Sequence, residues 1–148
     1  MYKRQTYYWR IDEVYGEEVI EGVVWSFTTV PGVLYVTDIT MDYTVKGKWY
    51  VAQAKVTLDV DDDSGTGNEI AGATVCGNWY YNANGQNTGN NVMVSVEGVV
   101  DSNGKVTIDS LHTTDGGLFK FEVTDILKEG LIYCSELNTE TSDLITVP

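Results

Sequence analysis

The sequence predicts an all-β protein folded as an antiparallel β-sandwich. Apolar residues alternate with polar ones at a period of two, for example at Val92, Val94 and Val96. Turn-forming residues separate such segments, as in Asp101-Ser102-Asn103-Gly104, because Asn and Gly tolerate the positive φ of tight hairpin turns. No segment has a convincing helical period. About seven or eight short strands with turns between them are typical of a sandwich.

Length and composition bound the organisation of the chain. Its 148 residues have room for one domain of ordinary size, or for one domain and part of another, and we favour the second. Hydrophobic residues make up 43 % of the chain, which is enough to form a core. Fifteen glycines against two prolines place most of the turns at glycine.

The charge of the chain narrows the classes of partner. Acidic residues outnumber basic ones by 22 to 9, for a formal net charge of −13. Such a chain repels phosphate backbones and anionic bilayers, so we expect neither nucleic acid binding nor membrane insertion. No apolar run is long enough to span a bilayer, and the start has no signal-peptide pattern. If the protein is secreted, its signal lies upstream of this fragment.

The first thirty residues are expected to be separate from the main domain. Residues 1–5, MYKRQ, resemble the translated end of a sequencing-library adapter, and we exclude them from the fold. Residues 6–30 alternate in the same way as two strands, and their TYYWRIDEV and VVWSFTT motifs resemble the last two strands of a fibronectin type III-like repeat. A hairpin alone is marginal in water, so we expect it to fray or to rest on the following domain. Val30-Pro31-Gly32 reads as the linker.

The remaining chain contains the strands of one complete domain, residues 33–148. Leu34–Tyr43 is rich in β-branched and aromatic residues. In Trp49–Val60, the even-numbered residues from Ala52 to Val60 are apolar and share the face expected to be buried. The other expected strands lie within residues 70–81, 92–108, 118–126, 130–137 and 143–147.

These segments together resemble a known type of domain. KWYVAQAKVTL, AGATV, DSNGKVT, LFKFEVTDI and the terminal ITVP are similar to the immunoglobulin-like accessory domains that follow the catalytic domains of secreted bacterial hydrolases. The resemblance covers nearly all of residues 34–148 and implies an immunoglobulin-like β-sandwich without catalysis of its own. Such domains act as spacers or attachment modules. The acidic turn near Asp61 and the Asn-rich loop at 82–91 depart from the usual form.

An acidic turn is the first candidate site. Asp59, Asp61 and Asp63 stand at every second position, and Glu69 follows. Oxygen ligands with this spacing can converge on Ca²⁺, although Ser64 stands where an EF-hand loop needs glycine. The alternative is a solvated turn whose charges prevent edge-to-edge aggregation. We therefore expect no cofactor other than a structural Ca²⁺ at this turn.

An aromatic segment followed by amides is the second candidate. Trp79, Tyr80 and Tyr81 precede Asn82 and Asn84, and sugar-binding modules use such rings for stacking and such amides for hydroxyl groups. The alternation that places Val75 inward also sends Trp79 inward, and Tyr80 also suits an ordinary sheet surface. Exposed rings would favour a sugar site, and burial of Trp79 would count against it.

Cysteine and histidine offer little further chemistry. Cys76 and Cys134 could form a disulfide in an oxidising compartment, but both face outward by alternation, so they can meet only if their strands are neighbours in one sheet. His112 is the only histidine and reads as a surface-loop residue. We find no catalytic triad, zinc cluster or phosphate-binding loop, and we expect no enzyme activity.

The sequence therefore suggests a non-catalytic, extracellular spacer or attachment module of a larger secreted or cell-surface bacterial protein. Its expected partners are the neighbouring domains of the same polypeptide. A polysaccharide or a cell-surface protein is a further candidate partner. Two alternatives stay open: a carbohydrate-binding module, and a subunit that self-assembles when the strands of residues 6–29 complete the sheet of a neighbour.

Overall fold

The computed structural model describes residues 6–28, 32–61, 70–85 and 91–148. The chain divides into two units, Met1–Pro31 and Gly32–Pro148, close to the position where the sequence suggests a linker. The described residues form strands and one short 3-10 helix. No helix in this part of the chain has the length and apolar character that crossing a bilayer needs.

The first unit is a β-hairpin made of two short ladders. β1 (Thr6–Trp9) pairs with β4 (Trp25–Thr28), and β2 (Glu13–Tyr15) pairs with β3 (Glu18–Ile20), both antiparallel. The sequence suggested two continuous strands, but the backbone ladder is interrupted between these pairs. There the carboxylate of Asp12 accepts a hydrogen bond from the backbone N–H of Gly22 at 3.1 Å. The same carboxylate forms an ion pair with Arg10, whose Nε lies 3.0 Å from Asp12 Oδ1. Side-chain bonds thus replace part of the ladder.

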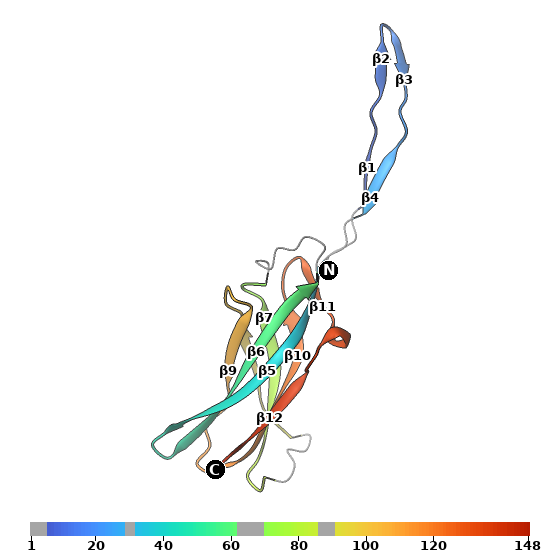
Figure 1. Ribbon diagram of the computed structural model, residues 1–148. Coiled ribbons are helices and arrows are strands. Elements are labelled where there is room, and N and C mark those ends of the chain that lie inside the picture. The colour runs from blue at the N-terminus through green and yellow to red at the C-terminus, as the bar shows by residue number, and fades with distance from the viewer. Residues whose placement is uncertain (1–5, 29–31, 62–69, 86–90) are drawn as a thin grey trace. The chain divides into compact units, whose positions relative to one another are not determined.

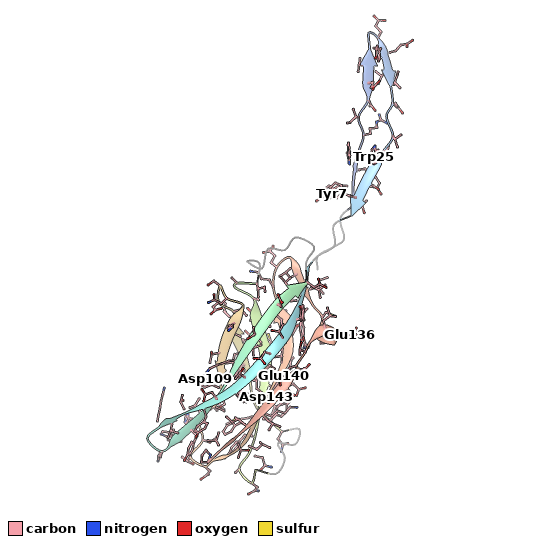
Figure 2. All side chains as sticks on the ribbon, in the orientation of Figure 1. Tyr7, Trp25, Asp109, Glu136, Glu140 and Asp143 are labelled. Atoms are coloured by element: carbon pink, nitrogen blue, oxygen red, sulfur yellow. The ribbon has the colours of Figure 1, made fainter. Side chains whose placement is uncertain are left out.

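Aromatic rings form cross-strand pairs on this hairpin. Tyr7 stacks on Phe27 with ring centroids 5.1 Å apart, and Trp9 stacks on Trp25 at 6.0 Å. The hairpin positions of Tyr7 and Trp25 are labelled in Figure 2. All four rings are exposed within the described part of the chain. The stacking stabilises the register of β1 and β4, and whether the hairpin frays or rests on another domain stays a prediction.

The second unit is a sandwich of two four-stranded sheets (Figure 1). One sheet has the strand order β12–β10–β7–β8, and the other has the order β11–β5–β6–β9. Every pair of neighbours is antiparallel except β11 and β5, which are parallel. The bounds are β5 (Gly32–Lys46), β6 (Trp49–Asp61), β7 (Thr74–Asn82), β8 (Val92–Val99), β9 (Lys105–Asp109), β10 (Gly117–Leu127), β11 (Leu131–Tyr133) and β12 (Ser142–Val147).

The β5–β6 hairpin is the longest ladder of the sandwich. It is paired from Val33 opposite Asp61 to Lys46 opposite Trp49. Gly47 makes the tight turn with φ of 64°, a conformation that glycine adopts without a steric penalty. The ladder shifts register near Thr37, and such bulges bend a strand and increase its twist.

The core lies between the two sheets and is centred on three rings. Trp79, Phe119 and Phe121 are fully buried, and the Trp79 ring lies 6.4 Å from Phe119 and 5.1 Å from Phe121 between centroids. The even-numbered residues from Ala52 to Leu58 are also buried, as the alternation in β6 predicted. The prediction of an all-β antiparallel sandwich is confirmed.

A segment between β10 and β12 closes one side of the sandwich. Residues 131–141, here called the strap, contain β11 and a 3-10 helix, Ser135–Leu137, where the sequence suggested one longer strand. The N–H of Cys134 donates to the carbonyl of Leu34, and the N–H of Thr139 donates to the carbonyl of Val36, both at 2.9 Å. The strap therefore occupies the edge of β5, which would otherwise present unpaired backbone groups.

Two strap side chains complete this contact. Asn138 Oδ1 accepts the backbone N–H of Val36 at 2.8 Å, and Glu140 Oε2 accepts the N–H of Ile39 at 2.9 Å. Asn138 Nδ2 also donates to the hydroxyl of Tyr133 at 2.8 Å, which fixes the orientation of the amide. Side chains thus serve backbone donors that a regular strand would serve with carbonyls.

Candidate functional site

Trp79 belongs to the core and not to a sugar-binding surface. It lies on β7 with its side chain fully buried against Phe119 and Phe121. Its indole N–H has no hydrogen-bond partner among the described residues. A stacking platform needs an exposed ring face, so Trp79 is removed from the candidate ligand-binding residues, and alternation in β7 gives the physical reason.

Tyr80 and Tyr81 are half-buried on opposite faces of β7. Tyr81 packs on Phe119 at a centroid distance of 4.7 Å, and its hydroxyl donates to the carbonyls of Asp115 and Gly116 at 3.2 and 3.1 Å. Tyr80 faces outward, where Lys120 Nζ lies 5.2 Å from its ring centroid. The three consecutive rings therefore do not form one platform.

The amides after β7 shape a turn. Asn82 Oδ1 accepts the backbone N–H of Asn84 at 2.9 Å, an Asx turn that ends the strand. Residues 86–90 of the Asn-rich loop lie outside the described residues. The structure thus separates the candidate ligand-binding residues into a core ring, two sheet residues and a turn: Trp79, Tyr80, Tyr81, Asn82 and Asn84.

Cys76 and Cys134, the pair that could form a disulfide, are not bonded to each other in the structure. Cys76 lies on β7, and Cys134 follows β11 in the other sheet, so the condition that their strands be neighbours is not met. Both are free cysteines, and each is half-buried. The pKa of the Cys76 thiol is raised, first by burial and then by the negative charges of Glu97 and Asp125. A raised pKa disfavours the thiolate that a catalytic cysteine requires.

The acidic turn is only partly described. Asp59 and Asp61 are exposed near the end of β6, whereas Asp63 and Glu69 lie outside the described residues. Tyr35 forms a side-chain hydrogen bond with Asp59, and its pKa is raised by desolvation and by the charges of Asp59 and Asp61. Within the described ranges, no three His, Cys, Asp or Glu side chains gather to hold a metal. The Ca²⁺ site stays a prediction.

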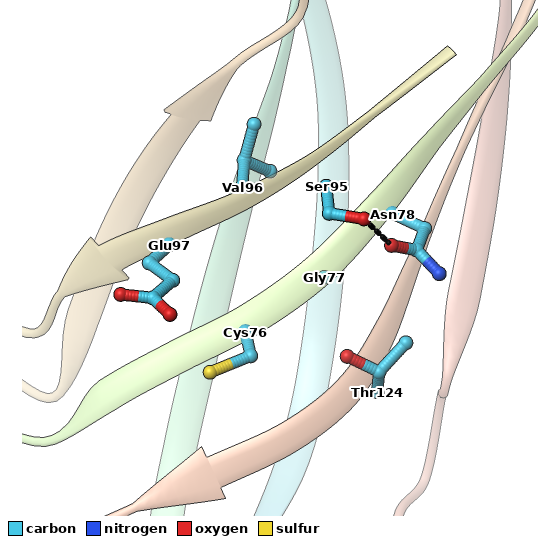
Figure 3. Close-up of a pocket in the computed structure, with 7 residues that line it drawn as sticks. All are labelled: Cys76, Gly77, Asn78, Ser95, Val96, Glu97 and Thr124. Carbon is cyan, nitrogen blue, oxygen red and sulfur yellow. Dashed lines mark hydrogen bonds between the residues drawn. The ribbon is translucent and has the colours of Figure 1, made fainter. Parts of the chain in front are cut away.

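A hollow opens on the outer face of the sheet that contains β7, β8 and β10 (Figure 3). Its volume is about 390 Å³. Ser95 Oγ donates to Asn78 Oδ1 at 2.8 Å at one side of the hollow. The lining residues are Cys76, Gly77, Asn78, Ser95, Val96, Glu97 and Thr124. The hollow is open and its lining is polar and apolar in equal parts, and the charged residue among its described lining residues, Glu97, is negative.

The exposed end of the β5–β6 hairpin holds a second ring that the sequence analysis did not assign to a site. Trp49 is 38 % exposed and meets His112 edge-on, with ring centroids 4.5 Å apart and planes at 79°. Lys48 Nζ lies 5.1 Å from the centroid of the Trp49 ring. An isolated antiparallel β-bridge between Tyr50 and Thr113 holds the start of β6 beside the segment that contains His112. The sequence signal was the run Lys46-Gly47-Lys48-Trp49, which combines a turn, two cations and an aromatic ring.

The comparisons with known proteins returned no match. No protein-family model, no curated protein and no solved structure matches this chain.

Two described surfaces carry groups that can contact a ligand. The Cys76 hollow combines an amide, two hydroxyl groups and a carboxylate with a thiol of raised pKa. The Trp49 cluster combines an exposed ring with cations. A ring beside cations can hold an anionic or apolar group without any bond being made or broken.

Proposed function

We propose that this chain is a non-catalytic spacer and attachment module of a larger secreted or cell-surface bacterial protein. Its partners are the neighbouring domains of the same polypeptide. The sandwich of residues 32–148 acts mechanically, by holding its two ends apart. A rigid module needs no reactive group to separate its neighbours, so the positions of its two ends are the feature that supports the proposal.

The carrying observation is that the sandwich is entered at one end and left at the other. β5 begins opposite the end of β6, where Val33 pairs with Asp61. β12 ends opposite the start of β10, where Val147 pairs with Gly117, and the end of β10 pairs with the start of β7. Figure 1 shows the start of β5 and the C-terminus at opposite ends of the sandwich. Modules with this layout can be joined in series.

The strand order supports the resemblance to immunoglobulin-like domains. In such sandwiches the first, second and fifth strands share one sheet, and the third, sixth and seventh share the other, which can gain an additional strand next to the third. β5, β6 and β9 follow the first pattern, and β12, β10, β7 and β8 follow the second. β11 is an addition to this plan. Since fold alone does not determine function, the position of the two chain ends at opposite ends of the sandwich supports the spacer function more strongly than the strand order does.

The same layout makes the sandwich resist tension. β5 and β12 run in the same direction and contact each other from opposite sheets. Tension applied at the start of β5 and the end of β12 is therefore directed along both strands. It shears the β5–β6 and β10–β12 ladders, so many hydrogen bonds must break together. The hairpin differs, because Thr6 and Thr28 are paired at the same end and its ladder opens one pair at a time.

Single-molecule force spectroscopy on the full chain, held between two marker domains, tests this proposal. We expect the hairpin to open first at low force. The sandwich should then unfold in one step at a clearly higher force, releasing about 3.6 Å per residue of 32–148. Stepwise opening of the sandwich at the force that opens the hairpin would rule out a spacer that resists tension.

Solution size separates this proposal from self-assembly. A spacer of this kind stays monomeric as its concentration rises. Sedimentation velocity at increasing concentrations checks this, and a reversible growth in mass would favour the alternative in which residues 6–29 add to the sheet of another copy. Deletion of the hairpin residues would then abolish that growth.

A further inference from the structure

Four residues at one end of the sandwich form a compact surface cluster, here called the Trp49 platform: Lys46, Lys48, Trp49 and His112. Lys46 pairs with Trp49 across the β5–β6 ladder. Lys48 Nζ approaches the Trp49 ring to 5.1 Å, and His112 contacts it edge-on at 4.5 Å. This end of the β5–β6 hairpin projects beyond the rest of the sandwich in Figure 1, where a ligand has access to it.

The two lysines of the platform are not neutralised by carboxylates. Among the described residues, ion pairs involve Arg10, Lys55 and Lys120, and neither Lys46 nor Lys48 takes part in one. The chain as a whole has a formal charge of −13. Two unpaired cations beside an exposed ring are therefore a local exception on an acidic protein.

The platform presents an aromatic ring beside cations. The exposed apolar residues next to it in the chain, Val45 and Leu111, alternate to the opposite face of the sheet from Lys46 and His112. The surface of the platform thus combines a ring and positive charge. A sugar ring offers the matching chemistry when it carries a carboxylate, because its C–H face packs on an aromatic ring while the carboxylate pairs with ammonium groups.

We propose that the Trp49 platform binds a saccharide carrying a single acidic sugar, such as a uronic acid. Trp49 stacks on the sugar ring, and Lys46 and Lys48 pair with its carboxylate. A long polyanion is excluded by the negative charge of the rest of the chain, whereas one carboxylate interacts chiefly with charges within a Debye length of about 8 Å. The inference goes beyond the spacer function and does not depend on it.

A second ring with a lysine provides a built-in comparison. On the other sheet Lys120 Nζ lies 5.2 Å from the ring centroid of Tyr80, nearly the same distance as in the platform. Lys120 is already paired with Glu122 at 3.1 Å, so an incoming carboxylate meets a neutralised lysine there. Tyr80 is therefore the matched control for Trp49.

The test follows the four indole N–H signals of the full chain by two-dimensional ¹H–¹⁵N NMR while a disaccharide is added. Cellobiouronic acid is the acidic probe, and cellobiose is its neutral counterpart. We expect the Trp49 signal to shift saturably with the acidic probe, while the signal of the buried Trp79 stays in place. Losing one exposed charge pair weakens binding by up to about fivefold, so cellobiose should bind about three- to fivefold more weakly.

Variants connect the shift to the platform. Lys46→Met combined with Lys48→Met should bring the affinity for the acidic probe down to that for cellobiose, and Trp49→Ala should abolish binding. Tyr80→Ala should leave binding unchanged. An unshifted Trp79 signal shows in each case that the sandwich is folded.

Several outcomes would overturn the proposal. They are equal affinity for the two disaccharides, unchanged binding after the lysine substitutions, loss of binding in Tyr80→Ala, and the absence of any saturable shift at Trp49. Competition by sodium acetate as strong as that by the disaccharide would also overturn it, because charge alone would then account for the site. None of these results bears on the force experiment, so the spacer function is tested separately.

Discussion

Asn138 and Val36 lie 102 positions apart in the chain, yet the side-chain oxygen of Asn138 accepts the backbone N–H of Val36 at 2.8 Å. Val36 is fully buried, so this N–H has no access to water. The bond links the strap to the first strand of the sandwich. A donor left unpaired at this place pays its full desolvation cost.

Substituting Asn138 should therefore destabilise the sandwich. We expect Asn138→Ala to lower the free energy of unfolding by about 1–3 kcal/mol, because it leaves the Val36 donor unpaired. Asn138→Asp should cost less, since it keeps the acceptor. Urea unfolding followed by circular dichroism measures both, with the exposed neighbour Thr139→Ala as the control. Equal stability of the Ala variant and the wild type would show that the strap does not hold β5.

Gly77 and Phe121 should show strong energetic coupling. A Cβ added at Gly77 would lie 2.6 Å from Phe121 Cε2 and 2.9 Å from the carbonyl oxygen of Glu122. We expect Gly77→Ala to cost about 1–3 kcal/mol through overpacking. Phe121→Leu makes room, so the double variant should lose less stability than the sum of the single losses. Additive losses in chemical denaturation would mean that the backbone near Glu122, and not the ring, resists the extra methyl group.

Local alternation predicted much of this fold. In β6 the even-numbered residues from Ala52 to Leu58 are buried as expected. Successive side chains of a strand point to opposite faces, so the residues that face the core recur at every second position. The same rule placed Trp79 inward and Cys76 outward, and both placements agree with the structure. A parity argument succeeds wherever one face of a strand is buried and the other is wet.

Contacts between distant segments could not be predicted in this way. The strap departs from a regular strand because Asn138 and Glu140 bond to β5, and no local pattern marks a partner about a hundred residues away. Cys76 and Cys134 have the same outward parity, but parity does not say which sheet a strand joins. The contact of Trp49 with His112 was missed for the same reason, since it depends on how the start of β6 meets the segment after β9.

Asp101 should make stability depend on pH in the acidic range. Its Oδ1 accepts the backbone N–H groups of Asn103 at 2.8 Å and Lys105 at 3.0 Å, and these bonds lower its pKa. Since the folded pKa lies below the ordinary value of about 3.9, protonation favours the unfolded chain. The contribution is present above that value and is lost as the pH falls through the folded pKa.

We therefore expect Asp101→Asn to be less stable than the wild type at neutral pH and to approach it as the pH falls below about 3.9. Urea midpoints measured between neutral and strongly acidic pH test this. Asp115→Asn is the control, because no hydrogen bond to its carboxylate is seen among the described residues. A gap between Asp101→Asn and wild type that stays constant with pH would contradict the assigned role of the charge.

Cys76 should react slowly with alkylating agents. Burial raises the pKa of its thiol, and the charges of Glu97 and Asp125 raise it further, so the thiolate is scarce at neutral pH. We expect iodoacetamide to modify Cys76 more slowly than it modifies glutathione, and Glu97→Gln to speed the reaction. Mass spectrometry of the intact chain follows the modification. A chain that takes up no label under native or denaturing conditions without reductant would instead show that Cys76 and Cys134 are bonded.

Trp79 offers a test of an unpaired polar group in the core. Its side chain is fully buried and its Nε1 has no partner among the described residues, so the indole N–H carries a desolvation cost of about 1–3 kcal/mol. Trp79→Phe removes that N–H but also leaves a cavity, and the two effects oppose each other. We expect Trp79→Phe to cost less than about 1.5 kcal/mol, against about 3–5 kcal/mol for Trp79→Ala. Calorimetric melting of both variants measures the two losses of stability. A Phe variant as unstable as the Ala variant would mean that Nε1 has a hydrogen-bond partner after all.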